Sequence, residues 1–148
     1  MPCSAKTTDP FAHRQTKIAM SYQNAYDGYH AVNLDTQTSR ASPVELVLLL
    51  TDGLLDELAR ARAHIVARRY EQKAISIDKC LEIINGLSGS LDFEGGGDTV
   101  TNLARVYEFC ANHLHRAGIK LDPAMVDEVT RVLSTIRQGW KGIQDRNG

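Results

Sequence analysis

The chain has 148 residues, a formal net charge of −1 at pH 7 and a hydrophobic fraction of 43%. This length suffices for one domain with its own core, and the nearly balanced charge argues against a general nucleic-acid binder. No apolar run is long enough to span a membrane, and the first twenty residues lack the apolar stretch of a signal peptide. The cysteines Cys3, Cys80 and Cys110 are too few and too scattered for a disulfide framework. The sequence therefore predicts a reduced, cytoplasmic protein without a membrane-inserted segment.

The N-terminal part of the chain divides into a tail and a short tyrosine-rich segment. Residues 1–20 are polar and aperiodic, so we expect a disordered tail followed by one folded domain over residues 21–148, with Met20 as an alternative start. Within residues 21–33, Tyr22, Tyr26 and Tyr29 recur at helical spacing and share one face of a short helix. This helix either packs permanently on the bundle or serves as a weakly held lid, because a short helix has little stability of its own.

The strongest helix signal of the chain begins at Ser42. Ser42 is a favourable N-cap, Pro43 fits the first turn, and Glu45 completes a capping box. Apolar residues then recur at three- and four-residue steps, which predicts a helix from Pro43 to about Arg69. This helix has more apolar surface than one core stripe needs. A second ridge and an opposite flank carry the surplus: Val44, Leu48, Leu55 and Val66, with Leu46 and Leu49 across from them. Residues outside the core must therefore cover the apolar surface of its first turns.

Three further helices follow, each with an apolar stripe. They are expected over about Tyr70–Leu91, over about Val100–Ala117 with Cys110 as a core residue, and from Pro123 to about Ile143. Tyr107 and Trp140 lie on these stripes and are expected to serve the core rather than to bind a partner. The glycine-rich stretch from Asp92 to Asp98 lacks the Gly-Lys-Ser/Thr ending of a phosphate loop, so we interpret it as an interhelical turn. No segment alternates like a strand. The predicted fold is all-α, an antiparallel up-down four-helix bundle with a short N-terminal helix packed on it.

The residue patterns of common bundle enzymes are missing from the sequence. A di-iron bundle needs inward Glu-x-x-His pairs, which the sequence lacks. His113 and His115 are two residues apart and point in different directions on a helix. His64 lacks the neighbours expected of a phosphotransfer histidine, which leaves that activity a distant third hypothesis. We expect no catalysis, no cofactor and no metal site.

A series of short motifs runs in a fixed order from about Tyr26 to Ile143. The series includes Ala41-Ser42-Pro43, Asp52-Gly53, Ala61-Arg62-Ala63, Gly96-Gly97, Asn102-Leu103, Tyr107 and Trp140. In this order and spacing the chain resembles the FliS family of flagellin-specific export chaperones. It departs from the family pattern at Thr51, where an aromatic residue is usual, and at Gly118, where Asn is common.

The resemblance implies a cytoplasmic helical bundle, monomeric or weakly dimeric, without catalytic activity or a cofactor. It implies binding to the C-terminal segment of new flagellin, prevention of premature polymerisation and delivery to the flagellar export gate. An amphipathic client needs an apolar groove, so we expect its site on the tyrosine segment and on the surplus surface of the helix that begins at Pro43. The candidate flagellin-binding residues are Tyr26, Tyr29, Val44, Leu48, Leu49, Asp52, Gly53 and Leu55. The alternative function is a generic helical-bundle adaptor that binds another amphipathic helical partner.

Overall fold

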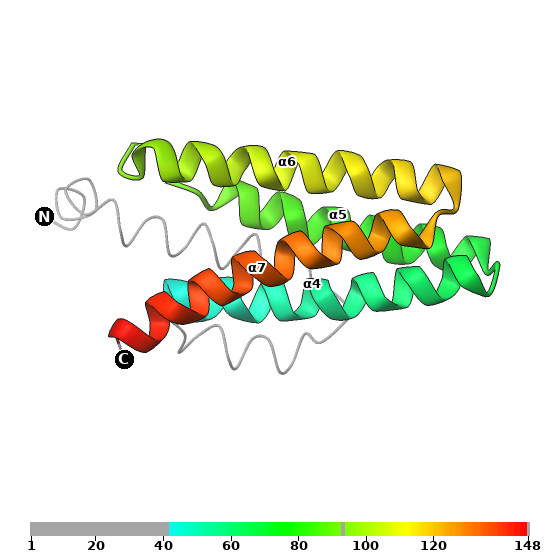
Figure 1. Ribbon diagram of the computed structural model, residues 1–148, viewed down its shortest axis with the longest axis horizontal. Coiled ribbons are helices and arrows are strands. Elements are labelled where there is room, and N and C mark those ends of the chain that lie inside the picture. The colour runs from blue at the N-terminus through cyan, green and yellow to red at the C-terminus, as the bar shows by residue number, and fades with distance from the viewer. Residues whose placement is uncertain (1–41, 93, 148) are drawn as a thin grey trace, which may run out of the picture.

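The computed structural model describes residues 42–92 and 94–147. This part of the chain contains four α-helices and no strand (Figure 1). The helices are α4 (Pro43–Val66), α5 (Tyr70–Gly89), α6 (Gly97–Lys120) and α7 (Pro123–Asn147). The prediction of an all-α fold with four long helices is confirmed for these residues, whereas the predicted tail and the tyrosine helix lie outside them. None of the described helices has the length and apolar character needed to cross a membrane.

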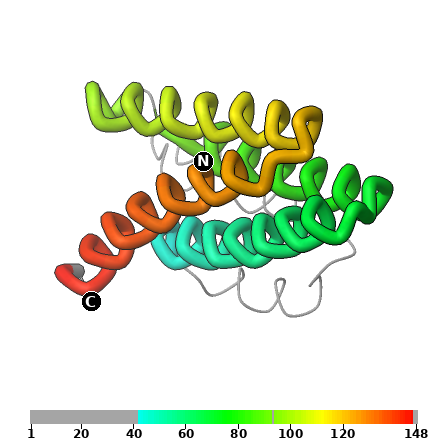
Figure 2. The backbone as a smooth tube through the Cα atoms, turned by 45° about the vertical axis from the view of Figure 1, so that its right-hand side comes forward, coloured from blue at the N-terminus to red at the C-terminus, as the bar shows by residue number. Residues whose placement is uncertain are grey.

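The four helices enclose one core. Each helix packs on the next one along the chain, and α7 also packs on α4. The views in Figures 1 and 2 agree that α7 starts beside the end of α6 and runs obliquely until its last turns lie beside the start of α4. The ends of α4 and α6 and the starts of α5 and α7 therefore lie at one end of the molecule. The start of α4 and the end of α7 lie at the other.

The start of α4 follows the local chemistry of its first residues. The Ser42 hydroxyl accepts the Glu45 N–H at 3.2 Å, and Pro43 occupies the first turn. The end of α4 differs from the prediction. The helix stops at Val66 rather than near Arg69, because Arg68 adopts a left-handed conformation with φ of 60° and turns the chain toward α5.

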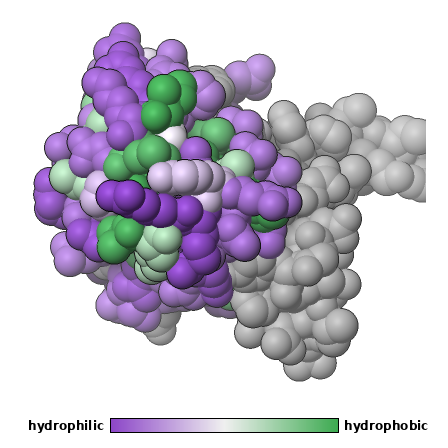
Figure 3. All heavy atoms as spheres, turned by 90° about the vertical axis from the view of Figure 1, so that its right-hand side faces the viewer, coloured by the Kyte–Doolittle hydropathy of each residue, from purple (hydrophilic) through white to green (hydrophobic). Residues whose placement is uncertain are grey.

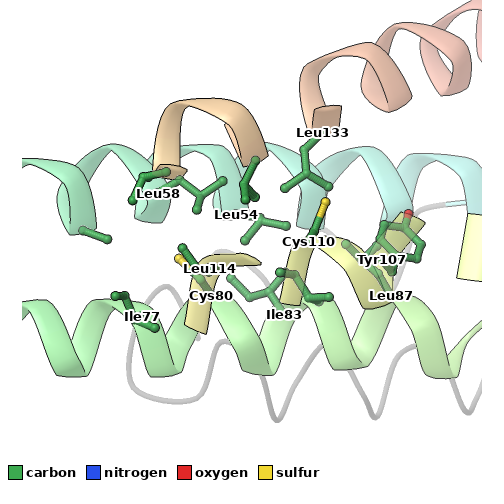
Figure 4. Packing of buried hydrophobic residues seen from close by; sticks show 14 of the residues in the cluster. Leu54, Leu58, Ile77, Cys80, Ile83, Leu87, Tyr107, Cys110, Leu114 and Leu133 are labelled. Carbon is green, nitrogen blue, oxygen red and sulfur yellow. The ribbon is translucent and has the colours of Figure 1, made fainter. Parts of the chain in front are cut away.

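The core is built from the predicted apolar stripes of all four helices (Figure 4). Its members are fully or almost fully buried, and burial of each large side chain contributes about 1.5–3 kcal/mol. They include Leu50, Leu54 and Leu58 of α4, Ile83, Ile84 and Leu87 of α5, Tyr107, Cys110 and Leu114 of α6, and Val126, Val129 and Leu133 of α7. The assignment of Cys110 and Tyr107 to the core is confirmed.

The glycine-rich stretch between α5 and α6 is a turn that satisfies its own backbone. The Asp92 carboxylate accepts the N–H groups of Glu94 and Gly95, each at 3.1 Å. A Cβ on Gly96 would lie only 1.7 Å from Cγ2 of Val100, and Gly97 has a φ of +58° that favours glycine. The interpretation as an interhelical turn is confirmed, since the stretch joins the end of α5 to the start of α6.

Candidate functional site

A cavity of about 200 Å³ lies at the end of the bundle that holds the start of α4. All four described helices contribute to its largely apolar wall, which includes Val44, Val47, Leu87, Val100, Tyr107 and Trp140. A cavity of roughly 150 Å³ can hold a molecule the size of benzene. This cavity therefore has room for one large apolar side chain of a partner but not for a whole helix.

Tyr107 and Trp140 form the inner wall of this cavity and contact each other. Tyr107 is 1% exposed, and burial raises the pKa of its phenol to about 12, while its hydrogen bond with Trp140 opposes part of that rise. Trp140 is partly buried and packs against the core cluster. It therefore serves the core, as predicted, and also presents apolar surface to the cavity.

Two ion pairs join α4 to α7. Arg62 Nε lies 2.7 Å from Asp127 Oδ1, and Arg137 Nε donates to Asp52 Oδ1. Each hydrogen-bonded carboxylate raises the pKa of its arginine above the ordinary value. The paired residues are ten apart on each helix, and on each helix the aspartate precedes the arginine in the sequence. Sequence reasoning missed Arg137 as the partner of Asp52, although this reciprocal spacing of opposite charges was a usable signal.

The second apolar ridge of α4 lies on the flank that faces α7. At 100° per residue, Val44, Leu48 and Leu55 share this flank with Asp52 and Arg62. Leu48 is 7% exposed but is not a member of the core cluster, whereas Leu55 is partly buried and packs against that cluster. Val44 lines the cavity. Helix α7 is therefore the neighbour of this ridge, which could not be assigned from the sequence.

The remaining candidate residues do not form one continuous surface with this ridge. Leu49 lies on the opposite flank of α4, where it is partly buried and packs against the core, and Gly53 is half-buried on the same side. Asp52 is exposed except for its contact with Arg137. Tyr26 and Tyr29 lie outside the described residues. Of the predicted residues that the structure describes, only Val44 lies in the cavity wall.

The buried thiols of the described residues are unsuited to nucleophilic chemistry. Burial raises the pKa of Cys80 well above its usual range, and the carboxylate of Glu57 raises it further. Burial alone raises the pKa of Cys110 to about 11. The described part of the chain also contains no group of three or more His, Cys, Asp or Glu side chains placed to hold a metal ion. The candidate functional feature of the described residues is therefore the apolar cavity, which could bind an apolar group of a partner.

Comparison with known proteins gives a consistent result. The family model described as "Flagellar protein FliS" matches residues 23–147. The chain is 37% identical to the flagellar secretion chaperone FliSB of Pseudomonas aeruginosa over 124 residues, which cover 84% of this chain and 98% of that protein. It is 34% identical to the flagellar secretion chaperone FliS of Salmonella typhimurium over 119 residues, covering 80% and 88% of the two chains. It is 32% identical to the flagellar secretion chaperone FliS of Vibrio cholerae over 121 residues, covering 82% and 89%. The chain belongs to the FliS family of flagellar proteins.

Proposed function

We propose that this protein is a cytoplasmic export chaperone that binds the C-terminal segment of flagellin. It prevents premature polymerisation of flagellin and aids its delivery to the flagellar export gate, acting as a monomer or weak homodimer and without catalysis. The observation that carries the proposal is the similarity to relatives named flagellar secretion chaperones over 98% of the length of one of them. We also take the four helices to form an up-down antiparallel bundle, because consecutive helices pack on each other and the ion pairs between α4 and α7 match residues in opposite chain order.

The cavity at the start of α4 suits an anchor of such a client. An amphipathic segment binds by placing spaced apolar side chains into pockets of a groove, and a central buried anchor commonly dominates the affinity. The cavity has the volume for one anchor, and Val44 and Trp140 form part of its wall. We propose that the client continues from this anchor along the outward face of α4, where the candidate residues Leu48, Asp52 and Leu55 lie on one flank and Leu49 and Gly53 lie on the other.

The burial of Leu48 has a consequence for binding. At 7% exposure it offers little surface in this state, so a client that contacts it must displace the groups that cover it. The free energy needed for that displacement is subtracted from the client's affinity. This supports the proposal that client binding and a change of contacts at α4 occur together, with Tyr26 and Tyr29 as the proposed additional contacts.

Calorimetric titration with flagellin tests the main proposal. Full-length flagellin is expected to bind, and flagellin that lacks its C-terminal segment is expected to bind much more weakly. Equal affinities for the two forms would show that the C-terminal segment is not the target. Absence of binding to both forms, with capture of another helical partner, would favour the generic adaptor.

The variant Val44→Asp tests the cavity. Val44 lies in the first turn of α4, where a carboxylate is favourable to the helix dipole, so the helix should stay intact. A charge beside the cavity must be desolvated when an apolar anchor enters. We expect flagellin affinity to fall at least about tenfold, which equals about 1.4 kcal/mol. Ala124→Asp is the matched control, because it adds the same charge to the exposed first turn of α7 at the other end of the bundle. Equal losses in both variants would exclude the cavity as the anchor site.

The double variant Tyr26→Ala/Tyr29→Ala tests the tyrosine segment. We expect an intact bundle by circular dichroism and weaker binding of the flagellin C-terminal segment, because the rings are proposed to contact the client. Equal affinity of wild type and variant would leave these tyrosines without a role in binding.

A further inference from the structure

The end of the bundle opposite the cavity exposes several large apolar side chains. The turn from α4 to α5 and the turn from α6 to α7 both lie there (Figure 1). Val66 is 59% exposed and Ile119 is 70% exposed, and Leu121 beside Ile119 is also exposed. Figure 3 looks onto this end and shows hydrophobic side chains in several separate groups among mostly hydrophilic ones. Exposed apolar patches rimmed by polar residues mark interaction sites more often than ordinary surface does.

A direct contact holds the two turns together. Lys73 Nζ of α5 donates to the carbonyl oxygen of Gly118 in the last turns of α6, at 3.0 Å. A Cβ on Gly118 would lie only 2.7 Å from Cδ1 of Ile77, so the end of α6 closely approaches α5. The apolar side chains of the second turn are therefore held beside the start of α5, next to the first turn.

Three cationic residues lie close to these apolar residues in the sequence. Arg68 lies two residues after Val66, Arg116 lies three residues before Ile119, and Lys120 directly follows Ile119. All three are exposed, and within the described part of the chain they form no ion pair. Arg69 is also at this end and donates to Nδ1 of His64 at 3.0 Å. Three cations are thus left to interact with a partner.

The carboxylates at this end do not neutralise these cations. Asp127 pairs with Arg62, and the Asp122 carboxylate accepts the N–H of Ala124 at the start of α7, at 3.0 Å. Glu71 is exposed in the first turn of α5. The local surface is therefore apolar with an excess of positive charge, although the whole chain carries a net charge of −1.

Both turns contain a residue in an unfavourable backbone conformation. Arg68 has a φ of 60° and Leu121 a φ of 54°, the left-handed region in which helix ends usually place glycine. In each turn the following N–H closes a six-residue ring, from Arg69 to His64 at 2.9 Å and from Asp122 to Ala117 at 3.1 Å. Glycine would make the same turns with less strain. A large side chain in both places is a reason to look for a use outside folding.

We propose that this end of the bundle binds an acidic amphipathic segment of a protein partner. We call it the turn surface, and it consists of Val66, Arg68, Arg116, Ile119, Lys120 and Leu121. The apolar side chains of the partner contact the three apolar residues, and its carboxylates pair with the three cations. A second copy of the chain is a poor occupant, because a symmetric contact would bring like charges together. An anionic membrane is the alternative occupant that the vesicle measurement described below distinguishes.

The test uses two labelled synthetic amphipathic helices with the same leucine and alanine pattern, one with glutamate and one with lysine on the polar face. Fluorescence anisotropy measures their binding to the full-length protein. We expect the glutamate peptide to bind at least about tenfold more tightly than the lysine peptide, which equals about 1.4 kcal/mol. The variant Arg116→Glu/Lys120→Glu should lose at least about tenfold in affinity for the glutamate peptide. Arg105→Glu, a charge reversal at an exposed site of α6 nearer its start, should not weaken binding.

A second variant separates binding from folding. Leu121→Gly removes both the apolar side chain and the backbone strain, so its melting temperature should equal or exceed that of the wild type while peptide affinity falls. Equal binding of the two peptides, or unchanged affinity in Arg116→Glu/Lys120→Glu, would overturn the proposal. The proposal would also be overturned if the wild type bound no glutamate peptide, whether or not it bound vesicles containing phosphatidylglycerol. None of these measurements uses flagellin, so their results test this proposal independently of the chaperone proposal.

Discussion

The burial of the Tyr107 phenol predicts that the protein becomes less stable at high pH. Burial raises its pKa from the ordinary 10.0 to about 12 in the folded protein. Between these values the unfolded chain loses the phenol proton while the folded protein keeps it, so the free energy of unfolding falls as the pH rises. The fall is about 1.4 kcal/mol by pH 11 and about 2.3 kcal/mol by pH 12. This part of the alkaline destabilisation should be absent from Tyr107→Phe.

Urea unfolding of wild type and Tyr107→Phe at pH 8 and pH 11 measures the effect. At pH 8 the variant should be less stable by about 1 kcal/mol, because the hydrogen bond with Trp140 is lost. At pH 11 the deficit should disappear, since only the wild type must keep a buried phenol protonated. Cys80 and Cys110 are present in both proteins, so their titration cancels in the difference. Tyr70→Phe, which removes a hydroxyl from a half-exposed ring, controls for the loss of one phenol. An equal deficit for Tyr107→Phe at both pH values would refute the reasoning.

Three further predictions concern other parts of the chain. Deletion of residues 1–20 should leave the melting temperature and the flagellin affinity unchanged, and a large loss of either by calorimetry would assign the tail a structural or binding role. Asp52→Arg and Arg137→Asp should each destabilise by no more than about 1 kcal/mol in urea unfolding, because the pair is on the surface. The double exchange should restore most of that loss, and additive losses would mean that the pair does not couple α4 to α7. Cys80 and Cys110 should react with a thiol reagent at pH 8 only as fast as the protein unfolds, because burial raises the pKa of both thiols, and fast reaction of either in the native state would contradict its burial.

The helices could be predicted from the sequence because their signals are local. Ser42 with Pro43 specifies the start of α4 through neighbouring backbone groups, and the apolar stripes specify which face of each helix is buried. The end of α4 was predicted about three residues too late. A left-handed arginine ends the helix there, and without glycine the sequence carries no local sign of that conformation.

The candidate site was less predictable because it depends on contacts between distant segments. The surplus apolar surface of α4 was identified, but the side that faces α7 could not be known without the packing of the two helices. The cavity depends on Val44, Leu87, Val100 and Trp140, which come from four different helices. In the sequence, each of these residues is indistinguishable from the other members of an apolar stripe. Only their meeting at one end of the bundle produces a space for a partner.

The ion pairs between α4 and α7 link the register of the bundle to the form of this cavity. A slip of α7 by ten residues in one direction would place Asp52 opposite Asp127, and in the other direction Arg62 opposite Arg137. Exposed ion pairs contribute little stability, but placing like charges opposite each other penalises the wrong register. Even a one-turn slip moves a helical residue about 5.4 Å along the axis, which would carry Trp140 away from Val44 and open or fill the cavity. The ion pairs between α4 and α7 therefore contribute little to the stability of the bundle. Their main effect is to set the register of α7, and thus which of its residues lie beside the start of α4.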